Sequence, residues 1–220
     1  MESRENHHHP PEHTFQETGI TERVENIQAV PTTTAILKRM RLGRPSLLHG
    51  LDETQLLTEL ENTQWQVRVA VIQKFEEYGE RAPIESLIMT IQDEHEAVRA
   101  AAAHALGVLQ NPKAVTSLVE ALQDPIWLVR AAAAQALGML GEHVPVEPLM
   151  FALYDEDESV RVVAVRVLAT MGERVPVEPL LTALQDSAWQ VREMALLALG
   201  TCGGDTVSYT HLTLPTILRV

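Results

Sequence analysis

Apolar residues recur along most of this chain at a fixed interval of 31 residues. A Val-Arg pair marks the same step and occurs at 67–68, 98–99, 129–130, 160–161 and 191–192. Three apolar columns keep the interval: Leu56, Leu87, Leu118, Leu149 and Leu180; Leu60, Ile91, Leu122, Leu153 and Leu184; and Phe75, Leu106, Leu137, Leu168 and Leu199. Units that cannot bury their apolar side alone bury it by stacking, so the interval predicts an array of repeats.

Each unit contains two amphipathic helices, which we name helix A and helix B. In the second unit, apolar side chains follow Val98 after three, four, seven, eight and eleven positions, which is one face of a helix. We predict helix A at 84–92, 114–123, 146–154 and 177–185, and helix B at 65–78, 96–109, 127–140, 158–171 and 189–202. The first unit begins with a capping box, Asp52 to Gln55.

The predicted fold is all-α: an α-solenoid of about five antiparallel helix pairs that turns as a right-handed superhelix. Its units lie at about 52–80, 81–111, 112–142, 143–173 and 174–206. Gly141 and Gly172 are expected to end helix B, and Pro145 and Pro176 to begin the next helix A. The polar residues 1–50 are interpreted as a leader or linker with a short helix at 33–42.

The stretch from Asp124 to Gly138 carries a resemblance to a known family. An aspartate six residues before the arginine, followed by Ala-Ala-x-Ala-Leu-Gly, resembles a HEAT repeat of the short type named in phycobilisome bilin lyases. The resemblance covers about residues 52–206. Tetratricopeptide and ankyrin repeats have similar periods, but their signatures are missing from the sequence.

The resemblance implies that the aspartate and arginine columns form a ladder between neighbouring units. An aspartate before helix B can accept hydrogen bonds from N–H groups of the first turn, and the next arginine can bridge to it. An acidic binding stripe is the alternative interpretation. The predicted ladder consists of Asp93, Arg99, Asp124, Arg130, Asp155, Arg161, Asp186 and Arg192.

The net charge of the chain narrows the classes of molecule that it is expected to bind. The 220 residues carry a formal net charge of −13. Residues 1–50 hold six acidic and six basic side chains, so the rest of the chain has 24 acidic against 11 basic, and five of these 11 are the recurring arginines. Few cations remain for phosphate groups, so nucleic acid is not an expected partner. The single Cys202 and the lack of a long apolar run indicate a cytoplasmic chain without a membrane partner.

The sequence offers no catalytic, metal or cofactor site. His7, His8, His9 and His13 could bind a metal loosely, but no second ligand cluster has zinc spacing. The iron of deoxyhypusine hydroxylase, also a HEAT-like array, sits on repeated His-Glu pairs. The corresponding positions here read Ala100-Ala101, Ala131-Ala132 and Val162-Val163, with single pairs only at His95-Glu96 and Glu142-His143. An oxidoreductase of that type is therefore the weakest of the alternatives.

Two rows of side chains are candidates for binding a partner. The first, which we name the helix-B row, lies off the predicted buried face and consists of Gln73, His104, Gln135 and Arg166, with Leu197 in the same column. The second lies at the start of helix B, where Trp65, Trp127 and Trp189 alternate with glutamates. These tryptophans can pack against a neighbouring loop or anchor a partner.

The sequence therefore predicts a non-catalytic scaffold or adaptor, which binds a protein or peptide on the concave helix-B surface and is a fragment of a longer repeat protein. A bilin-lyase-like accessory enzyme, or a subunit that presents a chromophore or substrate, remains the alternative. The string from Val207 to Val220 resembles a translated sequencing adapter. We interpret it as a non-native tail on a truncated array.

Overall fold

Alternating short and long helices follow one another through the computed structural model, which describes residue 48 and residues 50–202. The predicted leader, its helix at 33–42 and the tail at 207–220 lie outside these residues. Within them every regular element is helical, which confirms the all-α prediction. The handedness of the superhelix stays a prediction.

Five helix pairs make up the described array, and each pair has a short helix A followed by a longer helix B. The helices are α3 (Glu53–Glu59) and α4 (Trp65–Glu76), α5 (Ile84–Thr90) and α6 (Glu96–Leu109), α7 (Val115–Ala121) and α8 (Trp127–Leu140), α9 (Val146–Phe151) and α10 (Glu158–Thr170), and α11 (Val177–Ala183) and α12 (Trp189–Cys202). Short 3-10 helices join some of them at Gly79–Arg81, Pro112–Ala114, Gly141–His143, Ala152–Tyr154 and Gly172–Arg174.

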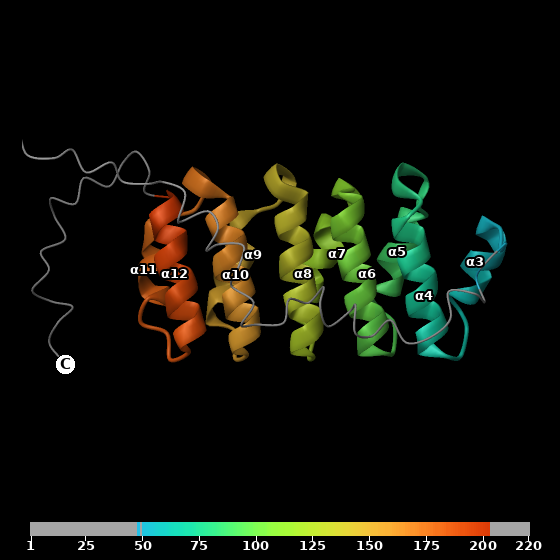
Figure 1. The fold of residues 1–220 in the computed structure, drawn as a ribbon, viewed down its shortest axis with the longest axis horizontal. Coiled ribbons are helices and arrows are strands. Elements are labelled where there is room, and N and C mark those ends of the chain that lie inside the picture. The colour runs from blue at the N-terminus through green and yellow to red at the C-terminus, as the bar shows by residue number, and fades with distance from the viewer. Residues whose placement is uncertain (1–47, 49, 203–220) are drawn as a thin grey trace, which may run out of the picture. The chain divides into compact units, whose positions relative to one another are not determined.

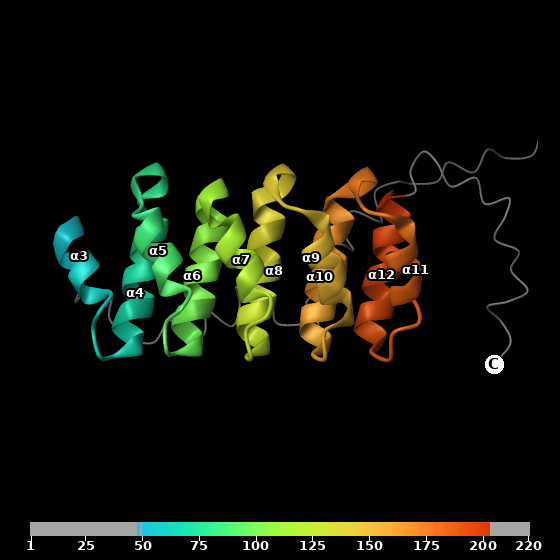
Figure 2. The same ribbon diagram turned by 180° about the vertical axis from the view of Figure 1, so that it is seen from behind.

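The helix pairs stack in sequence order and form two layers. Helices α4, α6, α8, α10 and α12 each pack against the next in one layer, as Figure 1 shows. Seen from behind, α5, α7, α9 and α11 form the second layer, and each of them packs against the helix B that follows (Figure 2). The stacked pairs confirm the solenoid that the interval of 31 residues predicts.

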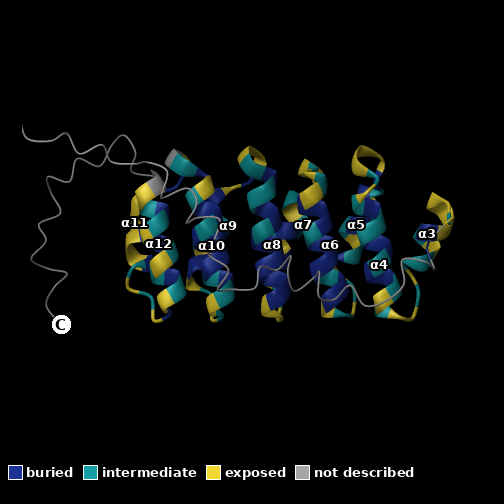
Figure 3. Ribbon diagram, in the orientation of Figure 1, coloured by how far each residue is buried: buried dark blue, intermediate teal, exposed yellow. Residues whose placement is uncertain are grey.

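The recurring apolar columns form the core between the layers. Every leucine of the column from Leu56 to Leu180 is at most 1% exposed, and Phe75 and the next three leucines of its column are fully buried. Figure 3 shows the buried residues concentrated along α6, α8 and α10. Leu199 of α12 is only half-buried, because α12 is the last described helix and has a neighbouring helix B on one side only.

Local sequence signals account for the helix ends. Asp52 accepts a hydrogen bond from the Gln55 N–H at 2.9 Å, and the Gln55 side chain accepts one from the Asp52 N–H at 2.9 Å, which confirms the capping box. Each helix A ends about two residues earlier than predicted. Bonds between residues three apart, such as Ile91 N–H to the Ile88 carbonyl, tighten its last turn before the chain reverses.

The turn after each helix B requires a left-handed residue. Gly79, Gly141 and Gly172 have φ values of 56°, 62° and 58° at this position. In the second unit Gln110 takes the same role with φ of 51°, and its side-chain amide donates to the Met139 carbonyl at 3.0 Å. Pro145 and Pro176 occupy the N-cap positions of α9 and α11, one residue before the helix, rather than its first turn.

Candidate functional site

The feature that recurs from unit to unit is an arginine that bonds both to the inter-helix turn of its own unit and to that of the next unit. Arg130 of α8 donates from Nε and Nη2 to the Asp155 carboxylate at 2.7 and 2.8 Å. Its Nη1 donates to the carbonyls of Asp124 and Pro125 at 2.9 and 3.2 Å, within its own unit. One side chain therefore holds its own inter-helix turn and the turn of the next unit at the same time.

Arg99 and Arg161 repeat this arrangement. Arg99 bonds Asp124 at 2.7 and 3.0 Å, and Arg161 bonds Asp186 at 2.7 and 2.9 Å, each across 25 residues. The partner arginine thus comes from the preceding unit. The aspartate six residues before the arginine contributes only its main-chain carbonyl.

The aspartates also order the turns in which they lie. The Asp93 carboxylate accepts from the His95 N–H at 2.8 Å, and Asp124 accepts from the Ile126 N–H at 2.9 Å. These donors are the N-cap residues of α6 and α8. The sequence had suggested N–H groups of the first helical turn instead. The difference arises because the aspartate precedes the helix by three residues, so its side chain reaches only the N–H two positions on.

The hydrogen bonds of the complete rungs favour the charged form of their arginines. Hydrogen bonding to Asp124, Asp155 and Asp186 raises the pKa of Arg99, Arg130 and Arg161, although burial opposes the rise. For Asp186 burial alone would raise the pKa, but hydrogen bonds from Arg161 and from the Ala188 N–H outweigh it, so the pKa is lowered. The charged forms of these three arginines and of Asp186 are therefore favoured in the folded chain, which stabilises the contact between units.

The first rung is incomplete. Arg68 of α4 bonds Asp93 through Nη2 alone at 2.6 Å, and its buried Nε has no hydrogen-bond partner among the described residues. The column that supplies aspartates elsewhere holds Asn62 in this unit, and its side chain accepts from the Gln64 N–H at 2.9 Å. The first unit is thus the least regular of the described array.

The structure places the four residues of the helix-B row at equivalent positions on α4, α6, α8 and α10, and all four are half-buried. On α6, α8 and α10 each residue of the row is flanked in sequence by a buried alanine or valine on both sides. His104 Nδ1 lies 3.1 Å from Glu76 Oε1 of α4, so this histidine joins two helices. Sequence reasoning missed Glu76, because the pair is separated by 28 residues and falls outside the interval of 31.

Arg166 differs from every arginine of the ladder. Burial lowers its pKa, and no ion pair or hydrogen bond connects its side chain to any residue that the structure describes. A cation that has lost part of its water without gaining a carboxylate is electrostatically unfavourable in the isolated chain. A negatively charged group on a partner would remove this penalty.

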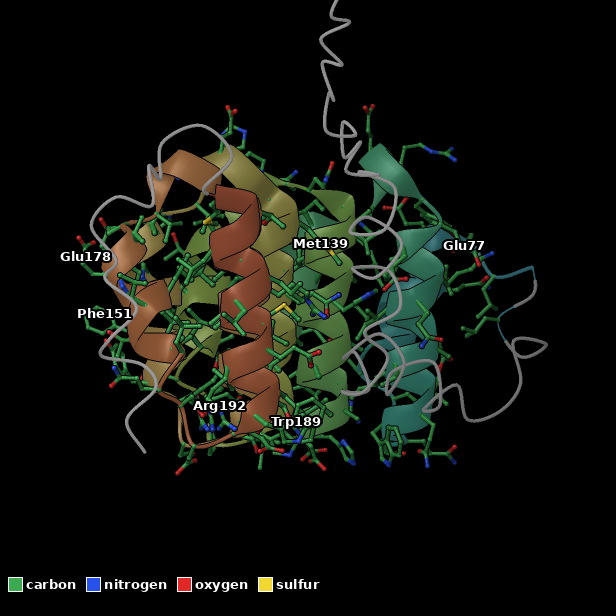
Figure 4. All side chains as sticks on the ribbon, turned by 60° about the vertical axis from the view of Figure 1, so that its left-hand side comes forward. Glu77, Met139, Phe151, Glu178, Trp189 and Arg192 are labelled. Carbon is green, nitrogen blue, oxygen red and sulfur yellow. The ribbon has the colours of Figure 1, made fainter. Side chains whose placement is uncertain are left out.

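The tryptophans do not share one environment. Trp65 stacks on His95 of the next inter-helix turn, with ring centroids 4.4 Å apart and planes 18° apart. Trp127 is 36% exposed and Trp189 is 52% exposed. Figure 4 shows Trp189 near Arg192 at the start of α12. Trp65 therefore packs against a neighbouring turn, whereas the rings of Trp127 and Trp189 are partly exposed to solvent.

The residues considered for metal chemistry are used otherwise. His95 is the N-cap of α6, and its Nδ1 accepts from the Ala97 N–H at 3.2 Å. Glu142 and His143 lie in the 3-10 helix after α8. In the described part of the chain no three His, Cys, Asp or Glu residues are grouped to hold an ion. His7, His8, His9 and His13 lie outside it. Nor does any described helix have the length and apolar character needed to cross a membrane.

Comparisons with known proteins agree on the architecture. A family model described as HEAT repeats matches residues 53–138, 87–155 and 146–213, which together span more than half of the chain. No curated protein matches the sequence at a significant level.

Several solved structures have a similar fold. The complex of CpcE and CpcF of phycocyanin lyase from Nostoc sp. PCC7120 is 23% identical, with a TM-score of 0.60 over 70% of this chain and 66% of that chain. A designed armadillo repeat protein in complex with peptide (KR)4 is 18% identical, with a TM-score of 0.51 over 83% and 98%. Computationally designed armadillo repeat proteins for modular peptide recognition are 20% identical, with a TM-score of 0.50 over 68% and 82%. At such identities the similarity concerns the fold.

Proposed function

This chain belongs to the HEAT-repeat family, and from that premise we propose that it is a non-catalytic scaffold or adaptor that holds a protein or peptide along its helix-B surface. The observation that carries the proposal is the helix-B row. In four successive units, the same position of helix B holds a half-buried polar side chain. Polar groups that are already partly desolvated lose less hydration when a partner covers them than fully solvated groups do.

The chemistry of the row suggests what it would bind. The amides of Gln73 and Gln135 can both donate and accept, which suits the main chain of an extended peptide. Arg166 suits a carboxylate, because a charge-assisted bond would replace the hydration that burial removes. Stacked helices lie about 8–10 Å apart and an extended chain advances about 3.3 Å per residue, so about three peptide residues would span each unit.

Charge argues against a nucleic-acid partner. Beyond residue 50 the chain carries 24 acidic and 11 basic side chains, and Arg99, Arg130 and Arg161 are already bonded to aspartates. We also propose a cytoplasmic location, because a chain with the single Cys202 has no internal disulfide that a reducing compartment would break.

The test is affinity capture with the full chain as bait and a variant in which His104, Gln135 and Arg166 are all replaced by glutamate. We expect the variant to lose the proteins that the parent captures, because three carboxylates would repel an acidic segment and remove the amide pairing. Circular dichroism should show that the variant remains helical. Unchanged capture by a folded variant would rule out the row as the binding surface.

A matched control lies on the other layer. Met89, Phe151 and Thr182 occupy one column of helix A at the same interval, and Met89 and Phe151 are 76% and 73% exposed. Replacing these three by glutamate introduces three carboxylates, as in the test variant, without touching the helix-B row, although the test variant also loses the positive charge of Arg166. Capture should survive this change, and an equal loss in both variants would mean that net charge rather than position decides binding.

The second candidate function is that of an accessory protein that presents a chromophore or acts like a bilin lyase. Its support is the similarity in fold to the phycocyanin lyase complex. The chain would be incubated with bilin and an apo-phycobiliprotein, with each omitted in turn. A visible absorbance band that requires all three components would favour this role over the scaffold.

A further inference from the structure

The turn before α8 exposes an apolar surface in the middle of the described array. Its residues Pro125, Ile126 and Trp127, which we name the Trp127 turn, are consecutive and all exposed, Ile126 by 37% and Trp127 by 36%. Helix α8 lies between α6 and α10, and both of these neighbours are described (Figure 1). The exposure of the turn therefore does not arise from an end of the array.

Trp65 shows how the same ring position is covered in another unit. It begins α4 as Trp127 begins α8, and its ring stacks on His95 of the next turn with the centroids 4.4 Å apart. The residue that corresponds to His95 beside Trp127 is Asp157, because each lies 30 positions after its tryptophan. A carboxylate side chain is too small to cover an indole ring.

The turns that hold His95 and Asp157 have the same backbone conformation. His95 has φ of −96° and ψ of 125°, and Asp157 has φ of −90° and ψ of 128°. Each N–H donates to the ladder aspartate two residues earlier, at 2.8 and 2.9 Å. Each residue is also the N-cap of its helix, and Asp157 accepts from the Ser159 N–H at 2.8 Å. The position that holds an imidazole against Trp65 thus holds a carboxylate beside Trp127.

Further carboxylates flank the Trp127 turn on both sides. Residues 93–99 before and within α6 include three acidic side chains and one arginine, and residues 155–161 of the next turn and α10 include four and one. The arginine of each stretch is already bonded to the aspartate of the following unit. Glu96 and Glu158, the first residues of α6 and α10, are exposed. The surface on either side of the exposed indole is therefore negative.

An arginine side chain fits both properties of this surface. A guanidinium is planar and charged, so it stacks on an indole face and forms paired hydrogen bonds with a carboxylate. It would take against Trp127 the place that His95 takes against Trp65. Asp157 can cap α10 with one oxygen and accept from the guanidinium with the other. Lysine offers a point charge without a plane, so it fits less well.

We propose that the Trp127 turn docks a basic segment of another protein, one arginine of which stacks on Trp127 and pairs with Asp157. Neighbouring units lie about 8–10 Å apart and an extended chain advances about 3.3 Å per residue. A second arginine about three positions away in the segment therefore reaches Glu96 of α6. The inference does not rest on the helix-B row, which consists of other residues and suits a ligand of the opposite charge.

The experiment measures the binding of a dye-labelled peptide, acetyl-Gly-Arg-Gly-Ser-Arg-Gly-amide, to the full chain by fluorescence anisotropy at physiological salt. Its arginines lie three positions apart. We expect saturable binding, weaker binding when lysine replaces both arginines, and none when uncharged citrulline does. In a chain whose Trp65 and Trp189 are replaced by phenylalanine, the unlabelled peptide should change the fluorescence of Trp127.

Two reciprocal substitutions test whether the cover of the ring decides binding. Asp157→His gives Trp127 the cover that Trp65 has, so the affinity should fall at least about tenfold and acrylamide should quench Trp127 less. His95→Asp opens Trp65 in the same way and keeps a good N-cap, so it should create a second binding site. Asp157→Asn also keeps the cap, and the loss of its charge should cost about fivefold in affinity.

Controls separate this site from net charge and from the helix-B row. Glu147→Gln removes one exposed carboxylate from α9, in the other layer, and should change the affinity by less than about twofold, because salt screens distant charges. Replacing Gln73 and Gln135 by alanine leaves the charge unchanged and should leave peptide binding unchanged. A loss in this double variant would assign the peptide to the helix-B row and overturn the inference.

The remaining outcomes also decide the proposal. It is overturned by the absence of saturable binding, by equal affinity for the lysine peptide, or by Asp157→His and Glu147→Gln having equal effects. The chain's own basic residues are the competing occupant. If replacing Lys38, Arg39, Arg41 and Arg44 by glutamine raised the affinity at least about tenfold, this segment rather than another protein would occupy the site, because a tethered ligand competes at high effective concentration.

Discussion

Arg130 and Asp155 meet through two hydrogen bonds of 2.7 and 2.8 Å while their side chains are only 8% and 10% exposed. The two residues belong to different units and are 25 positions apart in the chain. A bidentate pair that is almost fully covered is strong only while both charges are present, because a single buried ion is costly. The contact between units therefore depends on each partner.

Removing one charge of this rung should destabilise the array strongly. Asp155→Asn keeps an acceptor for the Asp157 N–H but leaves Arg130 without its carboxylate, so we expect a loss of about 3–5 kcal/mol in the free energy of unfolding. Urea titration followed by circular dichroism measures it. Glu156→Ala is the control, because Glu156 pairs with the same arginine at 3.2 Å but is exposed, and its loss should cost at most about 1 kcal/mol. Equal losses in both variants would contradict the role of burial.

Two glycines of one column should respond in opposite directions to alanine. Gly107→Ala brings a methyl group within 2.7 Å of the Ala136 main chain, so we expect a lower melting temperature. Gly200→Ala adds a methyl group in open space within a helix, and should stabilise α12 by about 0.5–1 kcal/mol through helix propensity. Thermal unfolding of the two variants tests the contrast. Stabilisation by both changes would mean that α6 and α8 do not approach so closely.

The lowered pKa of Asp186 predicts how stability depends on pH. Because the folded chain holds this carboxylate ionised, its contribution is present above the unfolded pKa of about 3.9 and is lost as the pH falls through the folded pKa. The parent should be more stable than Asp186→Asn at pH 7, and the difference should shrink below about pH 4. Melting temperatures at pH 7, 5 and 3 measure it. A difference that stays constant or widens in acid would contradict the prediction.

The three tryptophans should differ in their accessibility to a quencher. Variants that keep one tryptophan and replace the other two by phenylalanine would be titrated with acrylamide. We expect quenching to increase from Trp65, which stacks on His95, through Trp127 to Trp189, which is the most exposed. His95→Ala should raise the quenching of Trp65 and leave that of Trp189 unchanged. The reverse order would show that the rings pack differently in solution.

Much of the fold was predictable because the repeat is local. The apolar columns, the capping box at Asp52 and the left-handed glycines each act within one unit, where a few neighbouring residues decide the conformation. The bounds of helix B agree with the prediction to within two residues. Every helix A for which an end was predicted stops two or three residues early, because the tightening of the last turn leaves no mark in the apolar pattern.

The candidate surfaces were less predictable. The sequence identified the helix-B row by its spacing, but it could not show that His104 pairs with Glu76 or that Arg166 is desolvated, because both depend on how closely the neighbouring helices pack. The same holds for Trp65 and Trp189, which share a column and differ in exposure. The environment of a side chain depends on the residues that pack around it in space, and the position of a residue within the repeat does not identify those residues.

By itself the sequence determined the class of fold and the length of its unit, because a fixed interval of amphipathic helix pairs can bury its apolar side only by stacking. Only the tertiary structure decided that Arg99, Arg130 and Arg161 each bind the aspartate of the following unit, and that His104 lies against Glu76 of the preceding helix B. These features depend on contacts between residues about 25 or more positions apart. Such contacts exist only after the units have packed together.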